Sequence, residues 1–308
     1  MNSFDETEVT KSFGNFSPMK NYIKPPSIND YVLIDKIGSG AQGSVWKARD
    51  QTGKVVALKL IKLKQGRTQN LEEADKEVDA LIKLSTPSCD PYIICYYNSF
   101  YDAEEQVYVI VMEYIEGETL SIYSSNMRAL ANIRDPSKWS TLYRHLLLIT
   151  KDIIDAFIYM NSKGILHNDI KGGNIMIDTI MTPKLIDFGI SCMAGRCNIS
   201  NKMCCSGFGG TPYYVPPEVI ENQTRYATSD IWSLGVTLYK SATGSYPFNY
   251  PMGRRLPIGD ILSYTRDYIP NKLETSNELL NQIVNRCLNK DPFTRISSYD
   301  ISNLLEDL

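Results

Sequence analysis

The stretch Gly38-Ser-Gly40-Ala-Gln-Gly43-Ser-Val45 decides the fold. Its three glycines fit G-x-G-x-x-G, a pattern that arises by chance in roughly one 300-residue chain in ten when about 7% of residues are glycine, so the flanking residues have to identify the loop. A dinucleotide-binding loop needs the third glycine to open a helix, whereas Gly43 is followed by Ser-Val-Trp-Lys-Ala, which alternates like a strand. Val45 completes G-x-G-x-x-G-x-V, the pattern of a hairpin that covers phosphate groups. An ordinary glycine-bearing hairpin is the alternative on this stretch alone.

The residues around this loop are typical of strands. Hairpin residues, Asp50-Gln-Thr-Gly53, separate the second and third of four strand-like stretches. These stretches are Tyr31–Ile37, Ser44–Arg49, Lys54–Ile61 and Val107–Met112. Between the third and the fourth, apolar residues from Leu71 to Ile82 fall at helical spacing. The N-terminal third is therefore predicted to be a mostly antiparallel sheet with a single helix.

The rest of the chain has mainly helical patterns. An apolar stripe from Leu142 to Met160 predicts a long amphipathic helix, and the nearly apolar Asp230–Tyr239 predicts a buried one. We therefore expect an α+β protein with two lobes. Its expected divisions are an N-terminal tail of residues 1–30, a small sheet lobe of residues 31–114 and a larger, mainly helical lobe of residues 115–308.

Composition restricts the partners and the compartment. The 308 residues carry a net charge of −3, which is unlike the basic surface of a nucleic-acid binder or a polybasic membrane anchor. The longest apolar stretch, Val107–Met112, is far shorter than a membrane span, and the first ten residues have no apolar core of a secretory signal. Seven cysteines are an odd number in a long chain. We expect a cytoplasmic protein in a reducing compartment, without nucleic-acid or membrane partners.

Four further motifs follow the glycine loop in order. They are Val56-Ala-Leu-Lys59, His167-Asn-Asp169-Ile-Lys171-Gly-Gly-Asn174, Asp187-Phe-Gly189 and Pro216-Pro-Glu218. Each is a modest match alone, but the ordered set at suitable intervals is highly specific. On these motifs, residues 31–308 resemble the catalytic domain of eukaryotic protein kinases. The resemblance implies the bilobal kinase fold, with ATP and Mg²⁺ bound between the lobes and a γ-phosphoryl group transferred to a protein hydroxyl.

The resemblance makes Lys59 the residue that holds the α and β phosphates, and its ammonium needs a carboxylate partner. On the following helix Glu77 lies three residues after Ala74 and four before Leu81, so it points nearest the sheet. The two glutamates at the start of that helix face water instead. We therefore expect Glu77 to pair with Lys59, and the family interval agrees.

Four polar residues carry the remaining chemistry that the resemblance implies. Asp169 would accept the proton of the substrate hydroxyl, and Lys171 would neutralise the transferring phosphoryl group. Asn174 and Asp187 would supply the oxygen ligands that Mg²⁺ prefers. Singly, such loop residues are usually turn or capping residues, but the complete set favours the catalytic interpretation.

By the same resemblance, a further set of residues would surround the nucleotide. Met112 would stand at the back of the pocket, and Glu113 and Ile115 would offer backbone hydrogen bonds to the purine. The other members are Ile37, Gly38, Gly40, Gly43, Val45, Ala57 and Met176. The apolar members could equally be ordinary core residues, because burial alone does not separate the two roles. The resemblance also implies a stack of Leu81, Tyr96, His167 and Phe188, a Glu218–Arg295 ion pair, and Asp230 as a brace for the catalytic loop, which is His167–Asn174.

Lys171 and the Gly210-Thr211-Pro sequence resemble serine/threonine kinases, not tyrosine kinases. Asn168 departs from the family pattern, because arginine normally stands there and pairs with a phosphate on the activation segment. We therefore expect activity that does not require phosphorylation of that segment by this route. Gly173 lacks the carboxylate that some kinases use to read a basic residue before the acceptor, so arginine-rich substrates are not expected to be preferred.

Four cysteines follow the Asp187-Phe-Gly189 motif closely, and they are Cys192, Cys197, Cys204 and Cys205. They could bind zinc or form a disulfide that switches the loop. Their spacings are not the usual C-x₂-C pairs, so inert thiols are favoured. This segment and the Asn- and Ile-rich composition also resemble kinases of large DNA viruses.

A nucleotide-binding pseudokinase that acts as a scaffold is the alternative function. Loss of Lys59, Asp169, Asn174 or Asp187 would favour it, and all four are present. Residues 121–140 have no clear family match, and the oligomeric state is left open.

Overall fold

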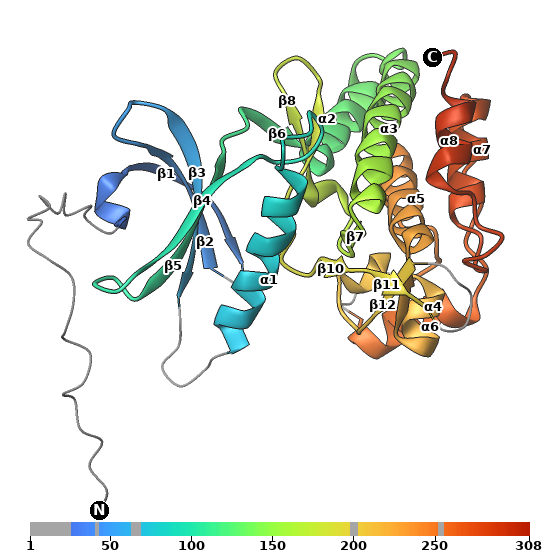
Figure 1. Cartoon of the computed structure of the whole chain (residues 1–308). Coiled ribbons are helices and arrows are strands. Elements are labelled where there is room, and N and C mark those ends of the chain that lie inside the picture. The colour runs from blue at the N-terminus through green and yellow to red at the C-terminus, as the bar shows by residue number, and fades with distance from the viewer. Residues whose placement is uncertain (1–25, 41–42, 63–68, 198–202, 252–255) are drawn as a thin grey trace, which may run out of the picture.

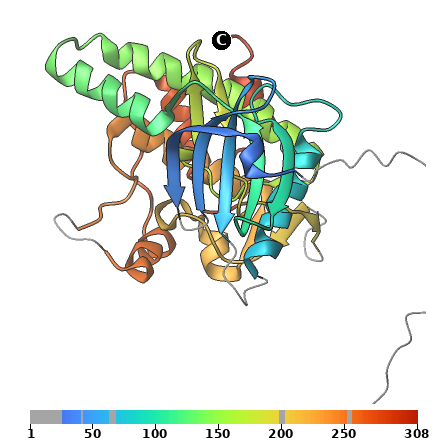
Figure 2. The same cartoon turned by 90° about the vertical axis from the view of Figure 1, so that its left-hand side faces the viewer.

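Five strands form the predicted antiparallel sheet of the N-terminal lobe. They are β1 (Val32–Gly40), β2 (Gly43–Arg49), β3 (Val55–Lys62), β4 (Tyr96–Asp102) and β5 (Val107–Glu113), in the order β1-β2-β3-β5-β4. Every neighbouring pair is antiparallel, and Figure 2 looks onto this sheet. The computed structural model describes residues 26–40, 43–62, 69–197, 203–251 and 256–308.

Strand β3 divides its side chains between two environments. Its register sets Ala57 opposite Met112 on β5, and Lys59 two residues further along. Because successive strand residues face opposite sides, Leu58 points the other way and packs in a separate apolar cluster. The face that carries Ala57 and Lys59 is turned toward the helical lobe, where the cavity described below lies.

Within the described part of this lobe, α1 (Gln69–Leu84) is the single α-helix, as predicted. It lies between the sheet and the helical lobe (Figure 1). Ala74, Val78 and Leu81 form its buried face, and Glu77 is buried on the same face with 2% of its surface exposed. The helical spacing therefore carries a carboxylate into the space between the lobes.

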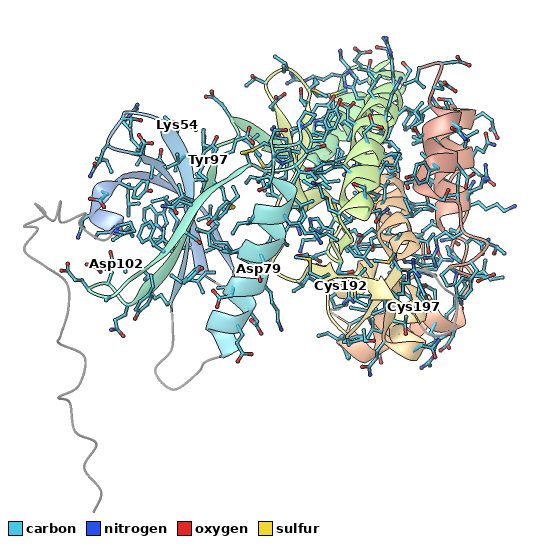
Figure 3. The ribbon with its side chains drawn as sticks, viewed as in Figure 1. Lys54, Asp79, Tyr97, Asp102, Cys192 and Cys197 are labelled. Atoms are coloured by element: carbon cyan, nitrogen blue, oxygen red, sulfur yellow. A yellow bond between two sulfur atoms is a disulfide. The ribbon has the colours of Figure 1, made fainter. Side chains whose placement is uncertain are left out.

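Residues 26–30, which the sequence assigned to the tail, are attached to the sheet. Ile28–Asp30 form a short 3-10 helix. The Ser27 hydroxyl and the Ile28 amide donate to the same oxygen of Asp102 at 2.8 and 2.9 Å, and Asp102, labelled in Figure 3, ends β4. The preceding residues 1–25 lie outside the described part of the chain.

The larger lobe is mainly helical, as predicted. Its helices are α2 (Leu120–Ile133), α3 (Lys138–Ser162), α4 (Pro217–Asn222), α5 (Ala227–Thr243), α6 (Ile258–Asp267), α7 (Glu278–Cys287) and α8 (Ser298–Leu304). The long apolar stripe lies within α3, and the apolar segment from Asp230 lies within α5, whose Trp232 is fully buried. Residues 121–140 form most of α2 and the first turn of α3, so this stretch is an integral part of the lobe. Among the described residues, none of the helices combines the length and the apolarity that a membrane crossing requires.

Short strands hold the loops that face the sheet lobe. They are β6 (Gly117–Thr119), β7 (Ile165–Leu166), β8 (Ile175–Asp178), β9 (Pro183–Leu185), β10 (Cys192–Met193), β11 (Gly195–Arg196), β12 (Met203–Ser206) and β13 (Thr224–Tyr226). They pair as β6-β8-β9, as β7-β10 and as β11-β12-β13. The α+β bilobal fold expected from the sequence is therefore confirmed.

Candidate active site

A cavity of about 840 Å³ lies between the two lobes, a volume typical of small-molecule sites. It is lined by β1, β2 and β3, by the end of β5, and by the loops around β8. The structure brings all the predicted site residues to this one cavity. They are Ile37, Gly38, Gly40, Gly43, Val45, Ala57, Lys59, Glu77, Met112, Glu113, Ile115, Asp169, Lys171, Asn174, Met176 and Asp187.

Several further lining residues were not singled out from the sequence, and two of them show why. Ile186 and Glu118 both line the cavity. Ile186 directly precedes the Asp187-Phe-Gly189 motif, and that position was a usable signal. Glu118 lies on the short strand β6 after the hinge between the lobes, where the sequence carries no distinctive pattern.

The third glycine of the opening motif is required by a close approach between two strands. Gly43 has φ +150°, and a Cβ atom there would lie 2.0 Å from the Leu60 carbonyl oxygen of β3. That separation is below any van der Waals contact, so a side chain at this position would push β2 away from β3. Glycine therefore keeps the hairpin close over the cavity.

Lys59 joins the two lobes electrostatically. Its Nζ lies 2.6 Å from a Glu77 oxygen and 3.0 Å from a carboxylate oxygen of Asp187. Burial alone would lower the pKa of Lys59, but the two carboxylates outweigh it and raise that pKa above its ordinary value. Burial also raises the pKa of Glu77, which Lys59 offsets only in part. Burial raises the pKa of Asp187, but this side chain is half-exposed, and the attraction and hydrogen bond of Lys59 outweigh the burial. The net effect lowers the pKa of Asp187, so this carboxylate is ionised at neutral pH.

Asp169 accepts hydrogen bonds at both carboxylate oxygens. The Thr211 amide and hydroxyl donate to Oδ1 at 3.0 and 2.7 Å. Lys171 Nζ and Asn174 Nδ2 donate to Oδ2 at 2.6 and 2.9 Å. Lys171 also donates to the Thr211 hydroxyl at 2.8 Å. These bonds fix the orientation of the carboxylate at the cavity wall.

A buried carboxylate accepts hydrogen bonds from the backbone of the residues just before Asp169. Asp230, 3% exposed, accepts hydrogen bonds from the His167 and Asn168 amides, each at 2.8 Å. Burial raises the pKa of Asp230, and these two amide bonds and the nearby His167 oppose that shift. Asn168 has φ +70°, a left-handed conformation that asparagine tolerates better than most residues. Asp230 thus stabilises a backbone turn that directs Asp169 into the cavity.

Two other expected contacts are also present. The rings of His167 and Phe188 lie 4.6 Å apart, and Leu81 and Phe188 are each 1% exposed within one core cluster. Arg295 donates to both oxygens of Glu218 at 2.8 and 2.9 Å. This ion pair anchors the end of the activation segment, by which we mean residues 187–218.

The cysteines of the activation segment are paired by disulfides, so the expectation of inert thiols is wrong. Cys192 pairs with Cys205 and Cys197 pairs with Cys204, and Figure 3 places Cys192 and Cys197 beside β10 to β12. Adjacent residues of a strand face opposite sides, so Cys204 and Cys205 on β12 form two separate pairs. Within the described ranges no cluster of His, Cys, Asp and Glu is arranged to hold a metal ion.

A third disulfide joins Cys89 to Cys95 in the loop between α1 and β4. Cys287 is buried in α7 as a free thiol. Disulfides are typical of oxidising compartments. The compartment expected from the sequence stays a prediction.

Comparison with known proteins agrees with this geometry. The family model "Protein kinase domain" matches residues 31–306. The chain is 30% identical over 281 residues to the serine/threonine-protein kinase ppk11 of Schizosaccharomyces pombe, covering 89% of this chain and 80% of that protein. It is 28% identical over 293 residues to mitogen-activated protein kinase kinase 2 of Arabidopsis thaliana, covering 92% and 74%. It is 31% identical over 276 residues to the serine/threonine-protein kinase TIO of the same plant, covering 88% of this chain but only 18% of TIO.

Proposed function

Because the chain belongs to the protein kinase family, we propose that its cavity binds ATP and transfers the γ-phosphoryl group to serine or threonine hydroxyls of a protein. The observation that carries this proposal is the setting of Asp169, which faces the cavity between Lys171, Asn174 and Thr211. In this proposal residues 31–114 are the ATP-covering lobe and residues 115–308 carry the protein substrate.

Asp169 directs the transfer. Its carboxylate accepts the proton of the acceptor hydroxyl while the hydroxyl oxygen forms a bond to the γ-phosphorus and the bond to the bridging oxygen of ADP breaks. Lys171 Nζ, which reaches both Asp169 and Thr211, places a positive charge beside the group in transit. The bonds from Thr211 keep the carboxylate aimed at the acceptor.

The other end of the cavity suits the phosphates and Mg²⁺. Lys59, held charged by Glu77, would contact the α and β phosphates. The amide nitrogen of Asn174 donates to Asp169, so its amide oxygen is the atom that would bind a cation. The Asp187 carboxylate is ionised. Oxygen donors of this kind fit Mg²⁺, which when bound neutralises phosphate charge.

Peptide libraries with serine, threonine or tyrosine as the sole acceptor test this function. We expect phosphorylation of the serine and threonine libraries with ATP and Mg²⁺, loss of it with EDTA, and recovery when Mg²⁺ is restored. Because Gly173 brings no carboxylate to the acceptor region, we expect no enrichment of arginine before the acceptor. Phosphorylation of the tyrosine library alone would refute the acceptor assignment.

We further propose that the kinase does not require phosphorylation of the activation segment through the route that uses an arginine at position 168. Asn168 carries no charge to bind a phosphate, and its Nδ2 donates instead to the Ile190 carbonyl at 3.1 Å and lies 3.2 Å from the Cys192 sulfur. Protein treated with a phosphatase, and shown by mass spectrometry to be unphosphorylated, is expected to keep its initial rate within about twofold. An inactive dephosphorylated protein that regains activity when the segment is phosphorylated would contradict this proposal.

A further inference from the structure

Arg225 is a buried charge with no part in the chemistry described so far. It lies on β13 and is 6% exposed. Burial lowers the pKa of Arg225, and the neighbouring Asp230 and Asp169 oppose that shift. A buried guanidinium is costly unless its N–H groups are bonded, so its partners indicate its role.

The guanidinium of Arg225 makes three hydrogen bonds to described residues, and all three go to backbone carbonyl oxygens. Nε donates to Gly207 at 3.0 Å, and Nη2 donates to Gly209 at 2.9 Å. Nη1 reaches the carbonyl of Asn168 at 3.5 Å. The planar fork of one arginine thus spans two chain segments, the end of the activation segment and the catalytic loop.

The activation segment needs such an anchor at this point. Gly207 and Gly210 have φ +139° and +102°, and Gly209 lies between them. Glycine-rich backbone loses the most conformational freedom when it becomes ordered. The ladder between β12 and β13 sets Cys205 opposite Arg225, and it ends where the glycines begin.

The anchored residues adjoin the reacting groups on both sides. Gly209 is two residues before Thr211, which donates two hydrogen bonds to Asp169. Asn168, the other partner, directly precedes Asp169. A Cβ atom on Gly210 would lie 3.0 Å from the Asn168 carbonyl oxygen, so the two segments are in close contact here.

We propose that Arg225 is a positioning residue for phosphoryl transfer, which holds the Gly207–Gly210 backbone against the catalytic loop so that Thr211 meets Asp169. This inference rests on the proposed function. It predicts a defect confined to the protein-substrate side, because none of the groups that Arg225 holds lies on the Lys59 side of the cavity. ATP affinity is therefore expected to be unaffected.

The test compares Arg225→Lys and Arg225→Met with wild type. Arg196→Met, a change at an exposed arginine of β11 in the same segment, is the matched control. Lysine keeps the positive charge but lacks the planar guanidinium that can donate to several carbonyls at once. The readouts are kcat and KM for a peptide that wild type phosphorylates, the affinity for a fluorescent ATP analogue, and hydrogen–deuterium exchange of residues 203–212.

We expect kcat/KM for the peptide to fall by about 10- to 100-fold in Arg225→Met, in line with the cost of a small misplacement of reacting groups, and by less in Arg225→Lys. ATP affinity should stay within twofold, and exchange of residues 203–212 should rise in both variants but not in Arg196→Met. Unchanged peptide kinetics, or an equal loss of ATP affinity, would overturn the proposal. If Arg225→Met does not fold, Arg225→Lys decides by the same readouts. Exchange is measured without catalysis, so a wild type that fails to phosphorylate any peptide refutes the proposed function and leaves the role of Arg225 testable.

Discussion

Asp169→Asn is expected to slow phosphoryl transfer by about 10²- to 10⁴-fold, the usual contribution of a general base. Asparagine has nearly the same shape but cannot take the hydroxyl proton. Both oxygens of Asp169 accept from two donors each, so the new amide NH₂ must also face groups that donate. The loss is therefore expected near the upper end of that range.

The measurement is the initial rate at saturating ATP and peptide, with a separate titration of a fluorescent ATP analogue. Nucleotide affinity should stay near that of wild type, because Lys59 and Glu77 are untouched. Asp260→Asn, at an exposed aspartate of α6, is the control and should leave both values unchanged. An Asp169→Asn rate within tenfold of wild type would contradict the assigned role.

Glu218→Ala is expected to cause the largest loss of stability. The Glu218 carboxylate bonds to both terminal nitrogens of Arg295 and accepts a bond from the Ser229 hydroxyl. The two charged side chains are 4% and 0% exposed. Removing one partner of such a pair leaves a buried uncompensated charge and costs about 3–5 kcal/mol. At roughly 2–4 °C per kcal/mol for a chain of this size class, we expect Tm to fall by about 10 °C.

Thermal unfolding followed by circular dichroism measures this effect. The control is Asp267→Ala, which removes an exposed carboxylate from its pairing with Arg266. Solvent screens that surface pair, so Tm should barely change. If both substitutions shift Tm by the same small amount, the Glu218–Arg295 pair does not anchor the activation segment as described.

The fold and the cavity could be predicted because both rest on local patterns. The spacing of apolar residues placed Glu77 on the buried face of α1, and the structure puts its carboxylate 2.6 Å from Lys59. The glycine motif followed by a strand excluded a dinucleotide-binding loop, and the structure has the antiparallel hairpin of β1 and β2 there. In each case the pattern of a few neighbouring residues is enough to predict the local structure.

The glycine contacts of Arg225 and the cysteine pairs of the activation segment could not be predicted, because they join positions with no common period. Arg225 donates to the backbone carbonyls of Gly207 and Gly209. Every residue has a backbone carbonyl, so no residue type in the sequence marks these acceptors. Four cysteines allow three pairings, and spacing does not select among them. The pairing of Cys204 with Cys197 depends on the β11–β12 register, which sets Cys204 opposite Gly195.

Transfer of label from γ-labelled ATP in a single turnover tests the central claim most directly, because it separates a kinase from a nucleotide-binding scaffold. Enzyme in excess over the labelled ATP is mixed with Mg²⁺ and a serine peptide. The reaction is then stopped, and the label in peptide, ATP and free phosphate is measured after these are separated. We predict that label moves to the serine hydroxyl with wild type and stays in bound ATP with Asp169→Asn. Label that stays in ATP with wild type as well, on every serine and threonine peptide tried, would contradict the account and favour a scaffold.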